Sequence, residues 1–335
     1  MNNSARMRLS AGLVVLSTAF PSVHAQTNIS VYGVADAGLV LERGTPTGNA
    51  TNISSGVSAG NRLGIKGKED LGDGNAAIFL LENGYNIDTG TAGQGGLLFG
   101  RQAYVGLSGA AGTLTAGRQY SPYYKVMRDV ADPFGIGFAG NSLNIMAGNT
   151  RVNNMVEYQS PRVGDWSADI GYGAGEIAGD SSLGSTISTA LAYTHGIVSL
   201  YAVEHRREQT TMKDHTSNSL FVAKVNLDTV AVSVAHAQNL GFGAARSNDS
   251  LLGVTVPFGR HKLLGSVIVH HDRVPVSGTA QQYGIAYVYS LSKRTELYAA
   301  YAHINNHSAT KFTVGNGTDV GSGNTATNLG IRHNF

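Results

Sequence analysis

The sequence predicts an all-β protein, a transmembrane antiparallel β-barrel of about sixteen strands. Glycine supplies 44 of the 335 residues, nearly twice its ordinary share, and helices tolerate glycine poorly. After residue 26 no run of 18 apolar residues occurs, so helical membrane spans are not predicted. Apolar and polar residues instead alternate with a period of two to the end of the chain. That pattern is typical of strands with one lipid face and one water face.

The first 25 residues are predicted to be a cleaved secretory signal peptide. Two arginines come first, residues 9–20 form a short apolar run, and residues 23–25 place small side chains at the −3 and −1 positions of a cleavage site. An N-terminal membrane anchor is the alternative, but the run is shorter than the ~20 residues that a spanning helix needs. The remaining residues, 26–335, are expected to form one outer-membrane barrel domain.

Composition excludes several classes of protein. A chain without cysteine has no disulfide framework, thiolate zinc site, iron–sulfur cluster or cysteine nucleophile. Arg6 and Arg8 are two of the 24 basic residues, so 22 basic residues stand against 22 acidic ones outside the first 25 residues. A neutral chain gives no support to nucleic-acid binding. We therefore expect neither a nucleic-acid partner nor a cofactor.

Sixteen alternating segments can be delimited, and single-chain outer-membrane barrels have an even number of strands. The last segment shows the pattern most plainly, because Leu329, Ile331 and Phe335 fall on one face while polar residues and glycine fall on the other. The predicted strands are, in chain order, 28–41, 61–69, 74–87, 97–107, 113–119, 151–159, 166–173, 186–195, 197–205, 218–227, 229–238, 250–256, 262–271, 281–290, 294–304 and 325–335.

The connections between these strands alternate between short and long. Short turns are expected at 70–73, 108–112, 195–196 and 291–293, and long polar loops at 42–60, 120–150, 174–185, 206–217 and 305–324. Outer-membrane barrels have short periplasmic turns and long external loops. A soluble β-sandwich has no reason to sort its loops in this way.

Six segments carry a family resemblance. They are 30–38 (SVYGVADAG), 61–72 (NRLGIKGKEDLG), 99–107 (FGRQAYVGL), 117–120 (GRQY), 289–295 (YSLSKRT) and 330–335 (GIRHNF). Together they resemble the general diffusion porins of the Gram-negative outer membrane, most of all the beta-proteobacterial branch. The resemblance implies a sixteen-stranded homotrimer whose third external loop folds into the lumen. It also implies contact with lipid and lipopolysaccharide, and passive diffusion of ions and small hydrophilic solutes.

Arginines are the candidates for one wall of a pore constriction. In the second predicted strand the alternation turns apolar side chains outward and Arg62 and Lys66 toward the lumen. The resemblance implies that Arg62, Arg101 and Arg151 line the constriction, and Arg118 is a weaker candidate. Arginine suits this role because its charge is permanent and its planar fork binds carboxylates and phosphates. The alternative is that these guanidinium groups only satisfy carbonyls or acids at the barrel rim.

The long loop at 120–150 is the one expected to fold inward, and it supplies the candidate acidic residues. Asp129 and Asp132 come just before Pro133-Phe134-Gly135. Related porins place an acid within a comparable Pro-Phe-Gly segment, whereas here the acids precede it, so both could instead cap or turn the loop. The assigned basic residues outnumber these two acids. The pore is therefore predicted to prefer anions.

The terminal strand is expected to pair with the strand at 28–41 and close the barrel, leaving no open edge in the membrane. Phe335 would anchor the lipid-facing row of Ile331 and Leu329, and the chain end resembles a barrel-assembly signal.

Two other functions are alternatives to a diffusion channel. The first is an outer-membrane barrel enzyme, a lipase or protease, which needs a nucleophile with His and Asp partners; no such combined pattern emerges. The second is a secreted β-rich adhesin, which would lack the terminal lipid-face alternation.

Residues 135–140 match a dinucleotide-binding pattern, but in a loop without the strand and helix that it requires. Adjacent histidines at 270 and 271 would point to opposite faces of a strand, so no metal site is expected.

Overall fold

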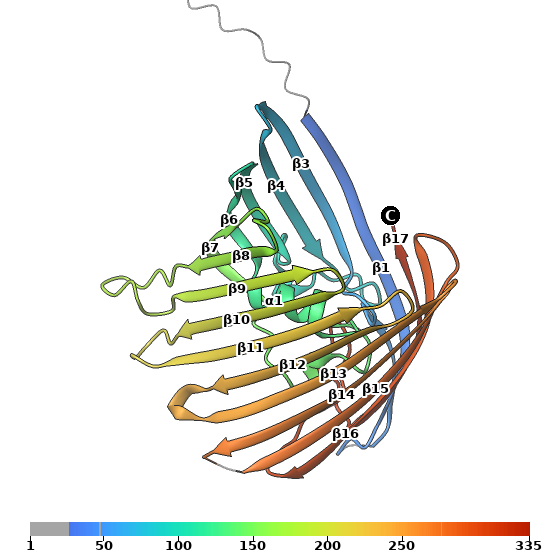
Figure 1. Ribbon diagram of the computed structural model, residues 1–335. Coiled ribbons are helices and arrows are strands. Elements are labelled where there is room, and N and C mark those ends of the chain that lie inside the picture. The colour runs from blue at the N-terminus through green and yellow to red at the C-terminus, as the bar shows by residue number, and fades with distance from the viewer. Residues whose placement is uncertain (1–26, 47, 276) are drawn as a thin grey trace, which may run out of the picture.

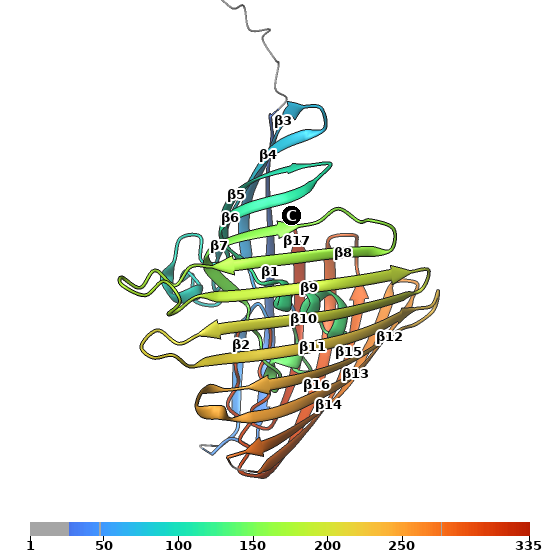
Figure 2. The same ribbon diagram turned by 60° about the vertical axis from the view of Figure 1, so that its left-hand side comes forward.

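The first and last strands pair and close the sheet into a barrel. The computed structural model describes residues 27–46, 48–275 and 277–335, and the predicted signal peptide lies outside these residues. Strand β1 (Thr27–Arg43) runs antiparallel to β17 (Thr325–Asn334). Leu39 lies opposite Leu329, and Ala37 lies opposite Ile331. Figures 1 and 2 show the closed sheet from two sides.

Among the described residues, seventeen strand segments form the sheet, and from β3 onward each pairs with its sequence neighbour. Between β1 and β17 they are β2 (Ala50–Ser55), β3 (Arg62–Gly72), β4 (Asn75–Gly84), β5 (Gln102–Gly109), β6 (Gly112–Tyr120), β7 (Arg151–Gln159), β8 (Trp166–Gly173), β9 (Thr186–His195), β10 (Val198–Glu208), β11 (His215–Asn226), β12 (Ala231–Leu240), β13 (Arg246–Phe258), β14 (His261–Val274), β15 (Gly278–Ser290) and β16 (Thr295–Ser308). Both β2 and β3 pair with the same edge of β1. They form one interrupted strand, so the predicted sixteen-stranded antiparallel barrel is confirmed.

The predicted strand boundaries are closest in the middle of the chain, where β7, β8 and β9 begin and end as predicted. The fourth predicted strand, 97–107, starts later, at Gln102. The predicted loop 42–60 contains β2, a short segment whose polar sequence gives no alternation signal. The predicted loop 206–217 is shorter than expected, because β10 and β11 extend into it.

The third loop, residues 121–150, folds into the barrel (Figure 1). It begins with α1 (Pro122–Val126), continues as the π-helical turn η2 (Met127–Ala131) and later forms η3 (Ser142–Asn144). The Ser121 hydroxyl accepts a 3.0 Å hydrogen bond from the Tyr124 amide and caps α1. Two further short turns, η1 (Gln94–Gly96) and η4 (Phe242–Ala244), lie in other loops. Within the described ranges, no helix is long and apolar enough to cross a membrane.

The third loop is amphipathic and buries its apolar side against the inner wall. Tyr123 and Met127 are fully buried. They belong to one cluster with inward-facing wall residues such as Leu220, Leu251 and Ile268. Burial of such side chains stabilises the seated loop by roughly 1.5–3 kcal/mol each. The opposite side of the helical segment is left facing the lumen.

A row of small inward-facing residues on neighbouring strands makes room for the loop backbone. Strand register places them side by side, as Ser233, Gly253, Ser266, Gly284 and Ala302. The Ser233 hydroxyl donates a 2.7 Å hydrogen bond to the carbonyl oxygen of Ala131. A Cβ atom on Gly284 would lie only 2.8 Å from the Cα atom of Gly140. Close approach of the loop therefore depends on a missing side chain at Gly284.

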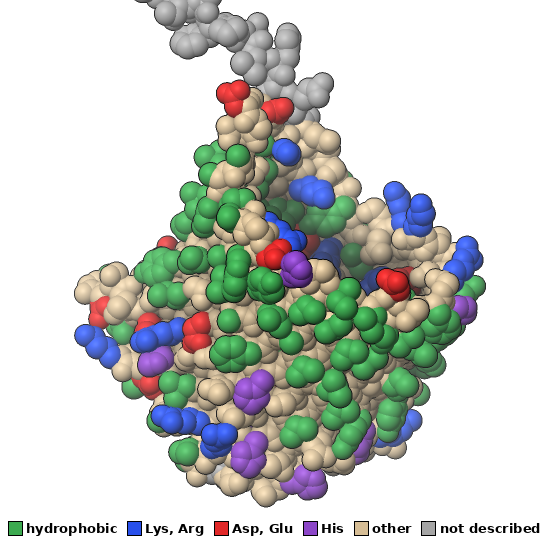
Figure 3. All heavy atoms as spheres, viewed as in Figure 1, with side chains coloured by type: hydrophobic (Ala, Val, Ile, Leu, Met, Phe, Trp, Pro, Cys, Tyr) green, Lys and Arg blue, Asp and Glu red, His purple; other side chains and the backbone are tan. Residues whose placement is uncertain are grey.

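The outer face of the barrel is broadly apolar, as Figure 3 shows for one side. Leu329, Ile331 and Phe335 each expose nearly half of their surface, and they lie on this outer face. Phe335 is tied to β1, because its amide and carbonyl groups bond to Gly33 at 3.1 and 3.0 Å. The described part of the barrel thus presents lipid-compatible side chains outward, whereas its inner face is polar around the lumen and apolar where the third loop packs.

Candidate functional site

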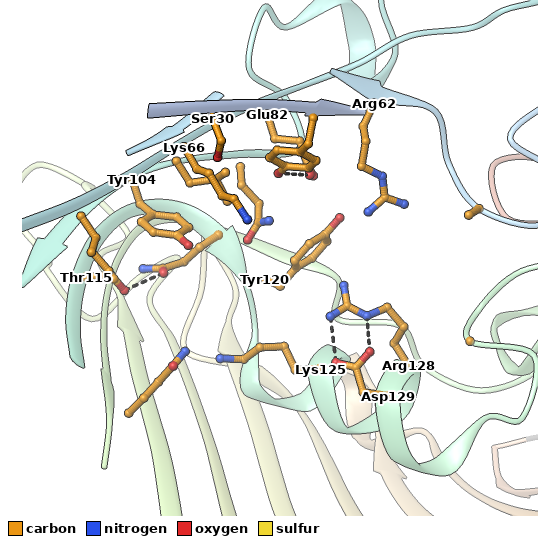
Figure 4. A pocket seen from close by; sticks show the side chains of 18 of the residues that line it. Ser30, Arg62, Lys66, Glu82, Tyr104, Thr115, Tyr120, Lys125, Arg128 and Asp129 are labelled. Carbon is orange, nitrogen blue, oxygen red and sulfur yellow. Dashed lines mark hydrogen bonds and ion pairs between the residues drawn. The ribbon is translucent and has the colours of Figure 1, made fainter. Parts of the chain in front are cut away.

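A cavity of about 1300 Å³ lies inside the barrel, between the wall formed by β1 and β3–β7 and the third loop. Figure 4 shows side chains from both sides pointing into it. Lys68 and Asp70 line it at the turn end of the barrel, whereas Arg62 and Arg128 line it beside the third loop.

Strand β3 supplies three basic side chains that line the cavity, Arg62, Lys66 and Lys68. Their neighbours Leu63 and Ile65 are exposed on the outer face, as strand alternation requires. Arg62 donates a 3.0 Å hydrogen bond from Nε to the carbonyl oxygen of Gly60. The arginine therefore has a fixed stem and a guanidinium group that points toward the lumen (Figure 4).

Arg101 and Arg151 lie behind Tyr120 rather than on the cavity surface. Arg101 is only 5% exposed, and its Nε atom lies 2.8 Å from Oε1 of Glu82. The Tyr120 hydroxyl accepts hydrogen bonds from Nη2 of Arg101 at 2.6 Å and from Nη2 of Arg151 at 3.1 Å. Tyr120 itself lines the cavity. Both charges are therefore close to the lumen, but the side chain of Tyr120 lies between them and the cavity.

Arg128, on the third loop, lines the cavity and was missed by the sequence reasoning. Its guanidinium group lies 5.0 Å from the ring centroid of Tyr120 and 5.4 Å from that of Tyr124. It also makes two hydrogen bonds, 2.7 and 2.8 Å long, to the carboxylate of Asp129. Burial acts to lower the pKa of Arg128, but the bonds to Asp129 prevail and raise it. The helical spacing of Lys125 and Arg128 is the signal that could have identified this basic face.

The two candidate acids of the third loop lie in different environments, one on the cavity surface and one buried within the loop. Asp129 lines the cavity, where Arg128 compensates its charge. Asp132 is buried, and its carboxylate accepts hydrogen bonds from the amides of Phe134 at 2.9 Å and Ser142 at 2.8 Å. The structure thus places Asp132 as an organiser of the loop, one of the two possibilities that the sequence left open, and not on the lumen surface.

Arg118 lies away from the cavity. The register of β6 shifts between Gly117 and Gln119, so alternation does not fix the direction of the Arg118 side chain, and Arg118 is not among the residues that line the cavity. Its Nε atom donates a 2.8 Å hydrogen bond to the carbonyl oxygen of Gly100, and Nη1 donates to Asn153. The sequence prediction for Arg118 therefore needs correction: it satisfies acceptors on neighbouring segments, which is the alternative considered for these arginines.

Positive charge in the cavity is only partly compensated. Four of its carboxylates are paired with basic groups, namely Glu82 with Arg101, Asp129 with Arg128, Glu157 with Lys125 and Glu296 with Arg332. Four basic side chains that line the cavity have no acidic partner within 4.0 Å among the residues described: Arg62, Lys66, Lys68 and Lys262. Asp70, at the turn end, is the cavity carboxylate left without a basic partner in the same set. The uncompensated charge on the cavity lining is therefore positive on balance.

Three loops meet above this cavity. The carbonyl oxygen of Val57 accepts hydrogen bonds from the amide of Phe138 at 2.7 Å and from that of Gly317 at 3.1 Å. These contacts join the insert between β2 and β3, the third loop and the loop at 309–324. Val314 of the last loop is 1% exposed. The predicted external loop at 305–324 therefore folds partly inward.

The insert between β2 and β3 also contains Gly56-Val57-Ser58-Ala59-Gly60, which has the spacing of a serine-nucleophile motif. This motif was not identified from the sequence. Ser58 Oγ accepts a 3.2 Å hydrogen bond from Nη1 of Arg332, and the Ser58 amide donates a 3.0 Å bond to the buried carboxylate of Asp36. These contacts anchor the insert to the barrel wall.

Known proteins share both the sequence and this architecture. Residues 12–309 match the family model described as Gram-negative porin. The chain is 27% identical to an outer membrane porin protein of Bordetella pertussis, over 94% of this chain and 96% of that protein. It is 28% identical to outer membrane porin protein 32 of Delftia acidovorans, over 93% and 95% of the two chains.

Two solved structures of other proteins have the same fold as this chain. An anion-selective porin from Comamonas acidovorans superposes with a TM-score of 0.78 at 25% identity, over 92% of this chain and all of that one. OmpT of Vibrio cholerae, solved in a trimer form, has a TM-score of 0.70 at 15% identity, over 92% and 99% of the two chains, and shares the fold. With a closed sixteen-stranded barrel, an inward third loop and matches along nearly its whole length, the chain belongs to the Gram-negative porin family of the outer membrane.

Proposed function

We propose that this protein is a passive, anion-preferring diffusion channel for ions and small hydrophilic solutes across the outer membrane. The observation that carries the proposal is the excess of uncompensated basic side chains on the cavity surface, led by Arg62 and Lys66. The anion selectivity of the similar Comamonas porin supports the same direction. Diffusion of solutes through the charged lumen is passive and requires no energy input.

The physical basis is the field inside a narrow passage. Two unit charges 4 Å apart interact by about 1 kcal/mol in bulk water and by about 4 kcal/mol at an effective dielectric constant near 20. A difference of 1.4 kcal/mol changes partitioning about tenfold. A few uncompensated cations therefore suffice to favour anions. Arg101, Arg128 and Arg151 add to the field from around Tyr120, although Glu82 and Asp129 offset part of it.

We propose a homotrimer with lipid and lipopolysaccharide as its surroundings, and a non-enzymatic role. The trimer is supported by the family and by the trimeric form of one protein of the same fold. The Ser58 contacts with Arg332 and the backbone anchoring by Asp36 support a structural rather than a nucleophilic role for the serine motif.

Planar-bilayer recording tests the function. Purified, folded protein should insert in steps, with closures in groups of three and a reversal potential in a KCl gradient that indicates chloride preference. The heat-resistant assembly in gel electrophoresis is the control for folding. Folded protein that never conducts would contradict the channel, and a cation-preferring reversal potential would contradict the selectivity.

A further inference from the structure

An apolar groove of about 730 Å³ lies on the outer face of β8–β12, the strands that run side by side in Figure 2. It is separate from the lumen cavity, and the channel function described above makes no use of it. The outward-facing residues that form it are Trp166, Leu191, Tyr193, Leu200, Ala202, Phe221, Ala223, Val234 and His236.

The groove arises from two small side chains among large ones. Register pairs Leu200 with Ala223 across β10 and β11, and Ala202 with Phe221 one outward position further along. Each pair thus sets a large side chain opposite an alanine, and the two alanines lie diagonally next to each other. Because the alanines leave space that the surrounding large residues enclose, a concave strip forms across the sheet.

A polar row bounds the groove toward the loop end. The next outward positions are Glu204 on β10 and Ser219 on β11, which are paired in register. The Ser219 hydroxyl donates a 2.5 Å hydrogen bond to Oε2 of Glu204. Gln238 continues this row on β12. The apolar surface therefore stops within the height of the strands, and the groove opens toward the turn end.

At the turn end the groove has an amphipathic margin. Trp166 and Tyr193 pack with their ring centroids 5.0 Å apart, beside the turn between β7 and β8. Arg162 on that turn is more than half exposed. Its Nε atom donates a 3.0 Å hydrogen bond to the carbonyl oxygen of Gly164, and its Nη2 atom donates to the carbonyl oxygen of Thr194 and lies 3.3 Å from the carboxylate of Asp165. Aromatic residues of this kind mark the interfaces of membrane barrels. Nη1 of Arg162 makes no hydrogen bond among the residues described, so this exposed guanidinium group keeps donors for a phosphate.

We propose that the groove binds one acyl chain of a glycerophospholipid from the leaflet at the turn end, with the lipid phosphate near Arg162. The occupant is assigned as lipid because the groove lies in the outward apolar band of a barrel that spans the outer membrane. The groove is closed by a polar row at its loop end and has Arg162 at its turn end, which matches a molecule with an apolar chain and an anionic head group. A flexible chain can also follow a shallow concave strip between side chains.

Photo-crosslinking tests the site. The folded wild-type protein is reconstituted in phosphatidylethanolamine and phosphatidylglycerol vesicles that contain a trace of phosphatidylglycerol with a diazirine on one acyl chain. After illumination, peptides are mapped by mass spectrometry. Adducts should concentrate on residues of β10–β12 rather than spread evenly over the outward faces of all strands.

Variants that fill the groove provide the matched comparison. The pair Ala202→Leu and Ala223→Leu should lower labelling of β10–β12 at least fivefold, whereas Ala299→Leu, an outward alanine on β16, should leave it unchanged. Both variants should keep wild-type conductance and heat-resistant assembly. Arg162→Gln, on the turn outside the strands, should lower labelling by the phosphatidylglycerol probe but not by a diacylglycerol carrying the same diazirine. Heat-resistant assembly of this variant is checked first, because Arg162 also bonds to the carbonyl oxygens of Gly164 and Thr194.

Three outcomes would overturn the proposal. The first is even labelling around the barrel, and the second is labelling of β10–β12 that survives filling of the groove. The third is a protein–protein adduct at this face under a lipid-free crosslinker, which would show that a second copy occupies the groove. If the double variant fails to assemble, the Arg162→Gln comparison between the two probes decides the question alone.

Discussion

The hydroxyl of Tyr120 accepts a 2.6 Å hydrogen bond from Nη2 of Arg101, at the point where β6 ends and the third loop begins. The same hydroxyl accepts from Arg151, and the ring lies beside Arg128 on the loop. One tyrosine therefore links three guanidinium groups that come from three different segments. This arrangement holds like charges close together without direct contact between them.

Tyr120→Phe should destabilise the folded protein by about 1–3 kcal/mol, because two guanidinium groups lose an acceptor while the ring remains. Urea unfolding followed by tryptophan fluorescence or gel mobility would measure the change. Tyr158→Phe is the matched control, since its exposed hydroxyl bonds only to the carbonyl oxygen of Ala111. That control should stay within about 0.5 kcal/mol of wild type. Equal unfolding midpoints for the two variants would mean that the Tyr120 hydroxyl has no such role.

Gly284→Ala should loosen the third loop. The added Cβ atom would lie 2.8 Å from the Cα atom of Gly140, a backbone atom that cannot move without the loop. Trypsin should then cut the variant after Lys125 or Arg128, both of which lie on the loop. Gly265→Ala, on the outward face of β14, has its nearest neighbour at 3.9 Å and should remain resistant. Resistance of both proteins would show that the loop does not depend on close approach at Gly284.

Phe335→Ala should reduce assembly. The Phe335 ring lies against Gly33, where a Cβ atom would be 2.2 Å from the ring, and the amide and carbonyl groups of Phe335 both bond to Gly33 of β1. Loss of the ring exposes Gly33 and weakens closure of the barrel. The yield of heat-resistant assembly in isolated outer membranes measures this, with Phe242→Ala in an exposed loop as the comparison. A wild-type yield for Phe335→Ala would rule out the assembly role.

The strands were predictable because alternation is a local property that a barrel requires along its whole length. β8 and β9 follow it without interruption, β7 departs from it only at Asn153 and Asn154, and the limits of all three match the prediction. β2 was missed because it is short and polar, and only its pairing with β1 makes it a strand. Its formation depends on the neighbouring strand rather than on its own sequence.

The candidate site was less predictable, since loops carry no comparable periodicity. Arg62 and Lys66 could be assigned to the lumen from alternation alone. Arg118 was misplaced because the register of β6 shifts between Gly117 and Gln119, so simple alternation does not fix the direction of its side chain. The position of Arg128 depends on the inward path of the third loop and on its stacking beside Tyr120, neither of which can be read from local sequence.

The central claim is that uncompensated basic side chains on the cavity wall set the anion preference. The most direct measurement is the reversal potential in a KCl gradient at low salt, where screening is weakest. The account predicts that Arg62→Gln with Lys66→Gln moves the chloride-to-potassium permeability ratio at least severalfold toward potassium. Arg118→Gln, which removes a charge away from the cavity, should leave the ratio at its wild-type value. If the double variant keeps the wild-type reversal potential, or if Arg118→Gln shifts it equally, the preference does not arise from this wall.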